Sequence, residues 1–66
     1  MPYRIRLREA RERAAIAHDR SAALHDRAAA MFDRLGRPDD ANRHRLAAKV
    51  DRDAAIADRA QDLSPV

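Results

Sequence analysis

The chain has 66 residues, no cysteine, one tyrosine and one phenylalanine, and its net charge at neutral pH is +3. A chain this short buries a small core, and the lack of cysteine excludes disulfides and cysteine-based zinc sites as means of stabilising it. We therefore expect a single domain over residues 1–66 that depends on regular helix packing, on self-association or on a partner.

The segment from about residue 3 to residue 35 predicts one long helix. Alanine, leucine, arginine and methionine dominate it, and neither glycine nor proline interrupts it. Its apolar or small residues recur in alternating steps of three and four, as at the a and d positions of a coiled coil. These positions are Tyr3, Leu7, Ala10, Ala14, Ala17, Ser21, Leu24, Ala28, Met31 and Leu35.

Two charged rows accompany this seam. Position g is always arginine, at Arg6, Arg13, Arg20, Arg27 and Arg34, and position f is acidic at Glu12, Asp19, Asp26 and Asp33. Most members of either row lack an opposite charge three or four residues further along the helix, the spacing that brings side chains together. We expect the arginine row to face acids on another helix or an external anion, although an arginine-rich composition also fits a GC-rich coding sequence.

Alanines also occupy the b and c positions of the same helix, where the residues are Ala15, Ala22, Ala29, Ile16, Ala23 and Ala30. One neighbouring helix covers one face, so these positions predict a second apolar face that meets another chain. The alternative is that alanine is present only because it favours helix and tolerates solvent. With self-association, the simplest closed arrangement is a homodimer of hairpins that forms a four-helix bundle.

Residues 36–40 predict a turn followed by a second helix. Gly36 suits the left-handed residue that ends a helix, Pro38 suits a first helical turn, and Asp39 and Asp40 suit its positive end. The second helix is expected over about 38–62, with a rougher seam because Lys49 and Asp53 interrupt it. A short loop makes the helices antiparallel, so the expected fold is an all-α two-helix hairpin with a frayed tail at 63–66.

Catalytic, metal and cofactor sites are not expected. His18 and His25 lie seven residues apart, which is too far for one ion without further ligands, and we expect both to flank the core. Ser21 has no activating neighbour, and no glycine-rich phosphate loop is present. No apolar segment follows the basic residues 1–13, and no run approaches the roughly 18 apolar residues of a membrane span. We therefore expect a cytoplasmic protein without enzyme activity.

The function that fits these observations is protein–protein interaction, either with a second copy or as an accessory subunit on a larger protein. The candidate interface residues are Leu7, Ile16, Leu24, Met31, Phe32, Leu46, Val50 and Ile56.

The alternative is nucleic-acid binding by the basic N-terminal segment. Residues 3–8 alternate between apolar side chains and arginine, which is also the pattern of a half-exposed strand. A strand followed by two helices resembles the ribbon-helix-helix proteins, and that resemblance implies a dimer that inserts a two-stranded ribbon into the major groove. As a ribbon or as a basic helix, the candidate contacts are Arg4, Arg6, Arg8, Arg11 and Arg13.

Overall fold

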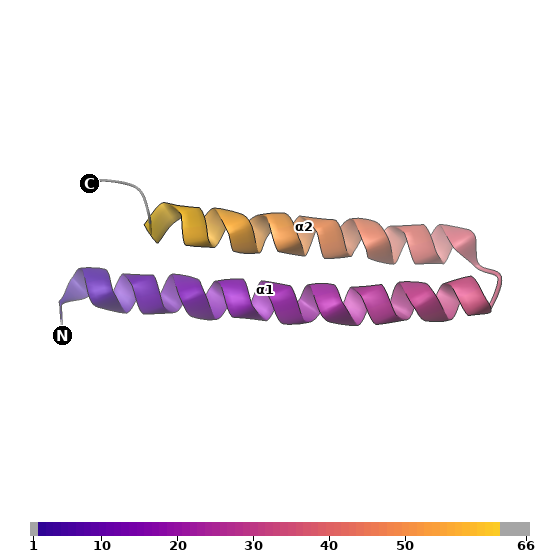
Figure 1. Cartoon of the computed structure of the whole chain (residues 1–66), viewed down its shortest axis with the longest axis horizontal. Helices are drawn as coiled ribbons and strands as arrows, with labels where there is room; N and C mark the ends of the chain where they lie inside the picture. The colour runs from indigo at the N-terminus through magenta and orange to yellow at the C-terminus, as the bar shows by residue number, and fades with distance from the viewer. Residues whose placement is uncertain (1, 63–66) are drawn as a thin grey trace.

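The computed structural model describes residues 2–62 and consists of two α-helices joined by a short turn. Helix α1 spans Tyr3–Arg34 and helix α2 spans Pro38–Asp62. The helices run antiparallel, side by side, in a molecule of 51 × 19 × 10 Å (Figure 1). The predicted two-helix hairpin is confirmed with bounds that agree to within one residue. The expected fraying of 63–66 concerns residues outside the described part.

The turn has the structure that its residues predict. Gly36 has a φ of +70°. Its N–H donates to the Asp33 carbonyl at 3.1 Å, and the Arg37 N–H donates to the Phe32 carbonyl at 2.9 Å. This pair of hydrogen bonds is a Schellman motif, which satisfies carbonyls that a helix end otherwise leaves free. Helix α2 then begins at Pro38, where a missing N–H removes no helical hydrogen bond.

The core between the helices consists of alanine. Six residues are at most 1% exposed: Ala15, Ala22 and Ala29 on α1, and Ala41, Ala48 and Ala55 on α2. Each set recurs every seven residues, so each forms one row along its helix. A methyl group is the smallest side chain after that of glycine, and these rows therefore let the helices approach closely. No larger side chain is fully buried among the described residues.

The face of α1 that contacts α2 differs from the expected one. The a/d seam was the predicted hairpin contact, but Tyr3, Leu24 and Leu35 are 61–70% exposed. The alanines at b, predicted to meet another chain, are buried against α2 instead. The polar residues on either side of the b row explain why this row faces α2. This face brings the α1 acids opposite α2 arginines on one side, and His18 and His25 opposite polar α2 residues on the other.

Residues 3–8 are helical and not a strand. The Pro2 carbonyl accepts hydrogen bonds from the N–H groups of Ile5 at 3.1 Å and Arg6 at 3.3 Å, so the helix is already formed there. The ribbon implied by the ribbon-helix-helix resemblance is therefore wrong for this chain. The first turns of α1 extend beyond the last described turn of α2 (Figure 1). Nucleic-acid binding by a basic helix remains a prediction.

Candidate functional site

Ion pairs connect the two helices along one side of the hairpin. Arg45 pairs with Asp33, Arg52 pairs with Asp26, and Arg59 contacts both Asp19 at 2.9 Å and Glu12 at 3.2 Å. We call this set the ion-pair ladder; its members are Glu12, Asp19, Asp26, Asp33, Arg45, Arg52 and Arg59. The acids are those of the predicted f row, and their partners on α2 recur every seven residues as they do.

The ladder is open to solvent. Its side chains are 41–49% exposed, so water screens each pair and the contribution of each pair to stability is small. A hydrogen bond from Arg52 is the main cause that lowers the pKa of Asp26 below its usual value. The structural effect of the ladder is to orient α2 on α1. Its electrostatic effect is to neutralise the acids of that α1 row.

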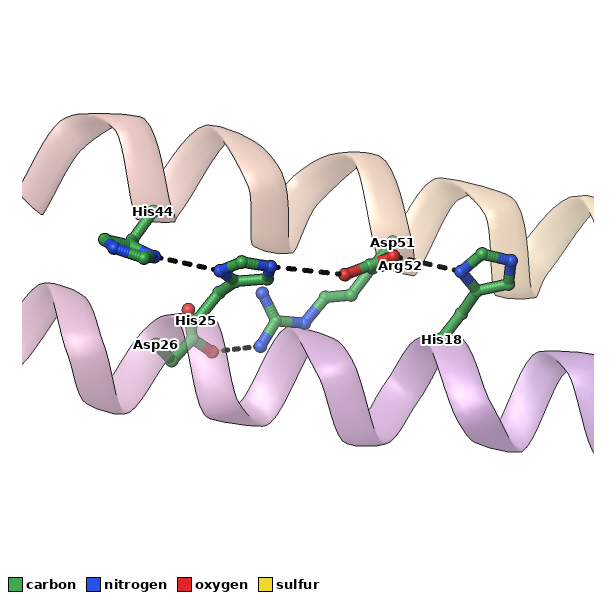
Figure 2. Close-up of polar contacts among 6 residues, drawn as sticks. All are labelled: His18, His25, Asp26, His44, Asp51 and Arg52. Carbon is green, nitrogen blue, oxygen red and sulfur yellow. Dashed lines mark hydrogen bonds and ion pairs between the residues drawn. The ribbon is translucent and has the colours of Figure 1, made fainter.

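A chain of polar contacts joins the two helices on the other side of the alanine core from the ladder (Figure 2). His18 Nδ1 lies 2.9 Å from Asp51 Oδ1, His25 Nε2 lies 3.9 Å from Asp51 Oδ2, and His25 Nδ1 lies 2.9 Å from His44 Nδ1. We call these four residues the histidine cluster. His18 and His25 come from α1, and His44 and Asp51 come from α2. The four side chains are half-buried.

Asp51 is the anionic centre of the cluster. Hydrogen bonds from His18 and then from Ser21 are the largest causes that lower the pKa of its carboxyl group. Near the turn the cluster ends in ring stacking, since the Phe32 ring lies 5.4 Å from that of His44 and the Arg37 guanidinium lies 5.3 Å from the centre of the Phe32 ring. The polar contacts between the helices therefore continue, through Phe32, as far as Arg37 in the turn.

The contacts of the cluster join α1 to α2. Ser21 on α1 hydrogen-bonds the Asp51 carboxylate on α2. The Nδ1–Nδ1 contact between His25 and His44 requires one ring to donate and the other to accept. Within residues 2–62, no group of three or more histidine and acidic side chains is arranged to hold a metal ion.

Sequence reasoning placed His18 and His25 along one edge of α1, and the structure confirms this placement. It missed their partners on α2 because it gave no role to the spacing of His44 and Asp51. These two residues are also seven apart, and with Ala41, Ala48 and Ala55 they form an unbroken series of steps of three and four. That series was the available signal for the face of α2.

The second candidate site is the a/d seam of α1, which we call the α1 stripe. Its d positions are exposed, and its Leu7, Ser21 and Ala28 are half-buried. Along it Tyr3, Leu24 and Leu35 are largely exposed and Met31 is 44% exposed. Because helical positions advance about 100° per residue, the stripe lies on the histidine side and the outer side of α1, away from the ladder. The five arginines of the g row border it, and all are exposed.

The remaining interface candidates do not form a second continuous row. Leu46, Val50 and Ile56 are 61–65% exposed on α2, where Asp53 interrupts their spacing. Ile16 is exposed on the ladder side of α1, next to the buried Ala15. Leu7 is half-buried, as is Phe32, whose ring stacks on His44 within the hairpin. Among the exposed large apolar side chains of the described residues, those of the α1 stripe keep the heptad spacing.

No helix within residues 2–62 has a segment long and apolar enough to cross a membrane. Comparison of the chain with models of protein families, with curated proteins and with solved structures gives no match.

Proposed function

We propose that the chain is a non-enzymatic protein–protein interaction module that accepts a helix of another chain along the α1 stripe. The observation that carries this proposal is that the small apolar side chains are buried and the large ones are exposed. The hairpin buries six alanines, while Leu24 and Met31 on α1 and Leu35 directly after it lie exposed at heptad spacing. Heptad spacing is the pattern that another helix fits.

Energetics support the same proposal. Complete burial of a leucine or methionine side chain contributes about 1.5–3 kcal/mol, whereas an alanine offers a single methyl group. A domain of this size without disulfides or metal usually needs more than one small core to be stable. Covering the α1 stripe supplies the apolar burial that the hairpin lacks, either in a four-helix bundle or on a larger protein.

The test compares two leucines that are matched in exposure, Leu24 at 61% in the stripe and Leu46 at 64% outside it. The probe is a synthetic helical peptide with a leucine and alanine heptad seam and glutamine at both flanks. We expect it to bind the full chain and raise its thermal midpoint in circular dichroism. Leu24→Asp should abolish binding because it places a charge in the seam, and Leu46→Asp should preserve it.

Sedimentation equilibrium of the chain alone completes the test. A dimer that Leu24→Asp converts to a monomer would also place the contact at the stripe. The proposal fails if the chain neither associates nor binds the peptide, or if both aspartate variants bind equally well.

A further inference from the structure

Formation of the hairpin leaves α1 with an excess of positive charge on its outer side. Glu12, Asp19, Asp26 and Asp33 all pair with arginines of α2. Glu9 is the one other acidic residue of α1. The arginines at position g receive no such compensation, because no ion pair joins them to another side chain within residues 2–61.

The arginine row borders the α1 stripe along its whole length. Its members, spaced seven apart, repeat about every 10 Å on an α-helix. Position g is the place from which charged side chains reach across to a partner helix in a coiled coil, where they determine which partner is accepted. The stripe and the row together therefore specify both an apolar seam and the charge beside it.

We propose that the helix accepted by the α1 stripe belongs to a different protein and carries acidic residues beside its own apolar seam. This inference rests on the proposed function above. A helix of that kind covers the stripe and neutralises the arginine row in one contact.

A second copy of α1 does not meet this requirement. In an antiparallel pair of α1 helices the two g rows face each other, so arginine would lie opposite arginine. In a parallel pair the g row faces position e, which carries no acidic residue and includes Arg4 and Arg11. In neither arrangement does the arginine row meet an acid, and arginine opposite arginine opposes association.

The helix α2 of a second copy is no better suited. On its outer side Asp53 already pairs with Lys49 at 2.8 Å. Asp40 is shared between Arg37 at 2.7 Å and Arg43 at 2.6 Å. Asp40 and Asp53 thus already have basic partners within their own chain.

A nucleic acid would satisfy the arginines alone. Phosphates offer no apolar surface, so Leu24, Met31 and Leu35 would stay exposed beside the bound strand. A protein helix matches both rows, and for this reason the geometry favours it.

The experiment uses two synthetic helical peptides of about the length of α1, with the same leucine and alanine seam and with either glutamate or lysine at the flanks. Affinity for the full chain is measured by fluorescence anisotropy at low and high salt. We expect the glutamate peptide to bind about tenfold or more tightly than the lysine peptide, because several exposed pairs act together. This preference should shrink as salt rises.

Variants of the arginine row test the cause of the preference. The triple variant Arg13→Glu, Arg20→Glu and Arg27→Glu should invert it, so that the lysine peptide binds more tightly. The matched triple change to lysine keeps the charge and should keep the preference. Equal helicity of the two variants in circular dichroism shows that the folded hairpin is compared in both.

The outcomes separate this inference from the proposed function. Equal binding of both peptides, abolished by Leu24→Asp, would overturn the acidic partner and leave the helix-docking function intact. Dimerisation of the chain through the stripe would do the same. Binding of duplex DNA that is steeply salt-dependent and unaffected by Leu24→Asp would overturn both and favour a nucleic-acid partner. No binding of either peptide would also overturn both.

Discussion

At the scale of single residues, the hairpin depends on side chains that are small. Ala22 and Ala48 are each at most 1% exposed, and each lies in the middle of its row. The sequence showed that alanine was abundant at several heptad positions, yet it did not show which row is buried. The helix propensity of an alanine is the same in every row. Which row is buried therefore depends on the residues of the second helix that lie opposite it.

Replacing one core alanine with leucine should force the helices apart. We expect Ala22→Leu to lower the free energy of unfolding by about 1–3 kcal/mol, because the extra carbons have no space between the backbones. Urea denaturation followed by circular dichroism measures the change. The control is Ala30→Leu, at an exposed position of the same helix, which should stay within about 0.5 kcal/mol of the wild type. Equal stability of the two variants would contradict the alanine core.

Polar residues at the seam show a different limit of sequence reasoning. His18 and His25 were recognisable as an edge of one helix, but Asp51 and His44 become their neighbours only when α2 takes its place. Contacts between residues so far apart in the chain depend on the relative rotation of the helices. The heptad spacing of residues on one helix does not determine how the two helices are rotated relative to each other.

At the scale of elements, the helices and the turn follow from local signals. Uninterrupted helix-forming residues, the glycine at the helix end and the proline that begins the next helix act within a few residues of themselves. These features were therefore predictable. The face of α1 was not, because α1 has two regular rows, the a/d seam and the b row, that compete for the same neighbour.

The turn should be sensitive to the backbone conformation of Gly36. Its φ of +70° is strained for a residue with a Cβ atom, although a Cβ there would meet no other atom within 4 Å. We expect Gly36→Ala to destabilise the hairpin by about 1–2 kcal/mol, and Gly36→Asn by less, since asparagine tolerates this conformation better. Thermal denaturation at fixed concentration measures both. Alanine and asparagine variants of equal stability would contradict this explanation.

At the scale of the whole molecule, charge divides the hairpin into distinct sides. The ladder lies on one side of the alanine core and the histidine cluster lies on the other side. The outer side of α1 carries the stripe with its arginines. From the sequence, the arginine row is expected to face acids on another helix or an external anion. Within the hairpin it is the α1 acid row that pairs across the helices, with Arg45, Arg52 and Arg59.

Acid should weaken the hairpin through its carboxylates. The pKa values of Asp26, Asp40 and Asp51 are lowered in the folded chain, chiefly by hydrogen bonds from Arg52, Arg43 and His18 respectively. The unfolded chain therefore binds more protons, so stability falls as pH decreases below about 4, near the unfolded pKa of aspartate. Helicity followed by circular dichroism should decrease over that range.

The control for this acid transition is a chain with Asp26→Asn and Asp51→Asn. It should be less stable than the wild type at neutral pH and lose less stability on acidification, since two of the shifted carboxyls are absent. An acid transition of unchanged size in this variant would show that other groups cause it.

The sevenfold regularity of the ladder has a consequence for how the two helices find their alignment. If α2 slid along α1 by one heptad, Arg45 would meet Asp26 and Arg52 would meet Asp19. Ala41 and Ala48 would still face alanines of α1, whereas Ala55 would move towards Arg8, the residue seven before Ala15. Arg59 already touches Glu12, its partner in that slipped register. Most of the ladder and of the alanine contact would therefore exist in both alignments. The short turn, the position of Arg8 and the contacts of His44 and Asp51 favour the observed one, so a hairpin with a longer loop should populate the slipped register more.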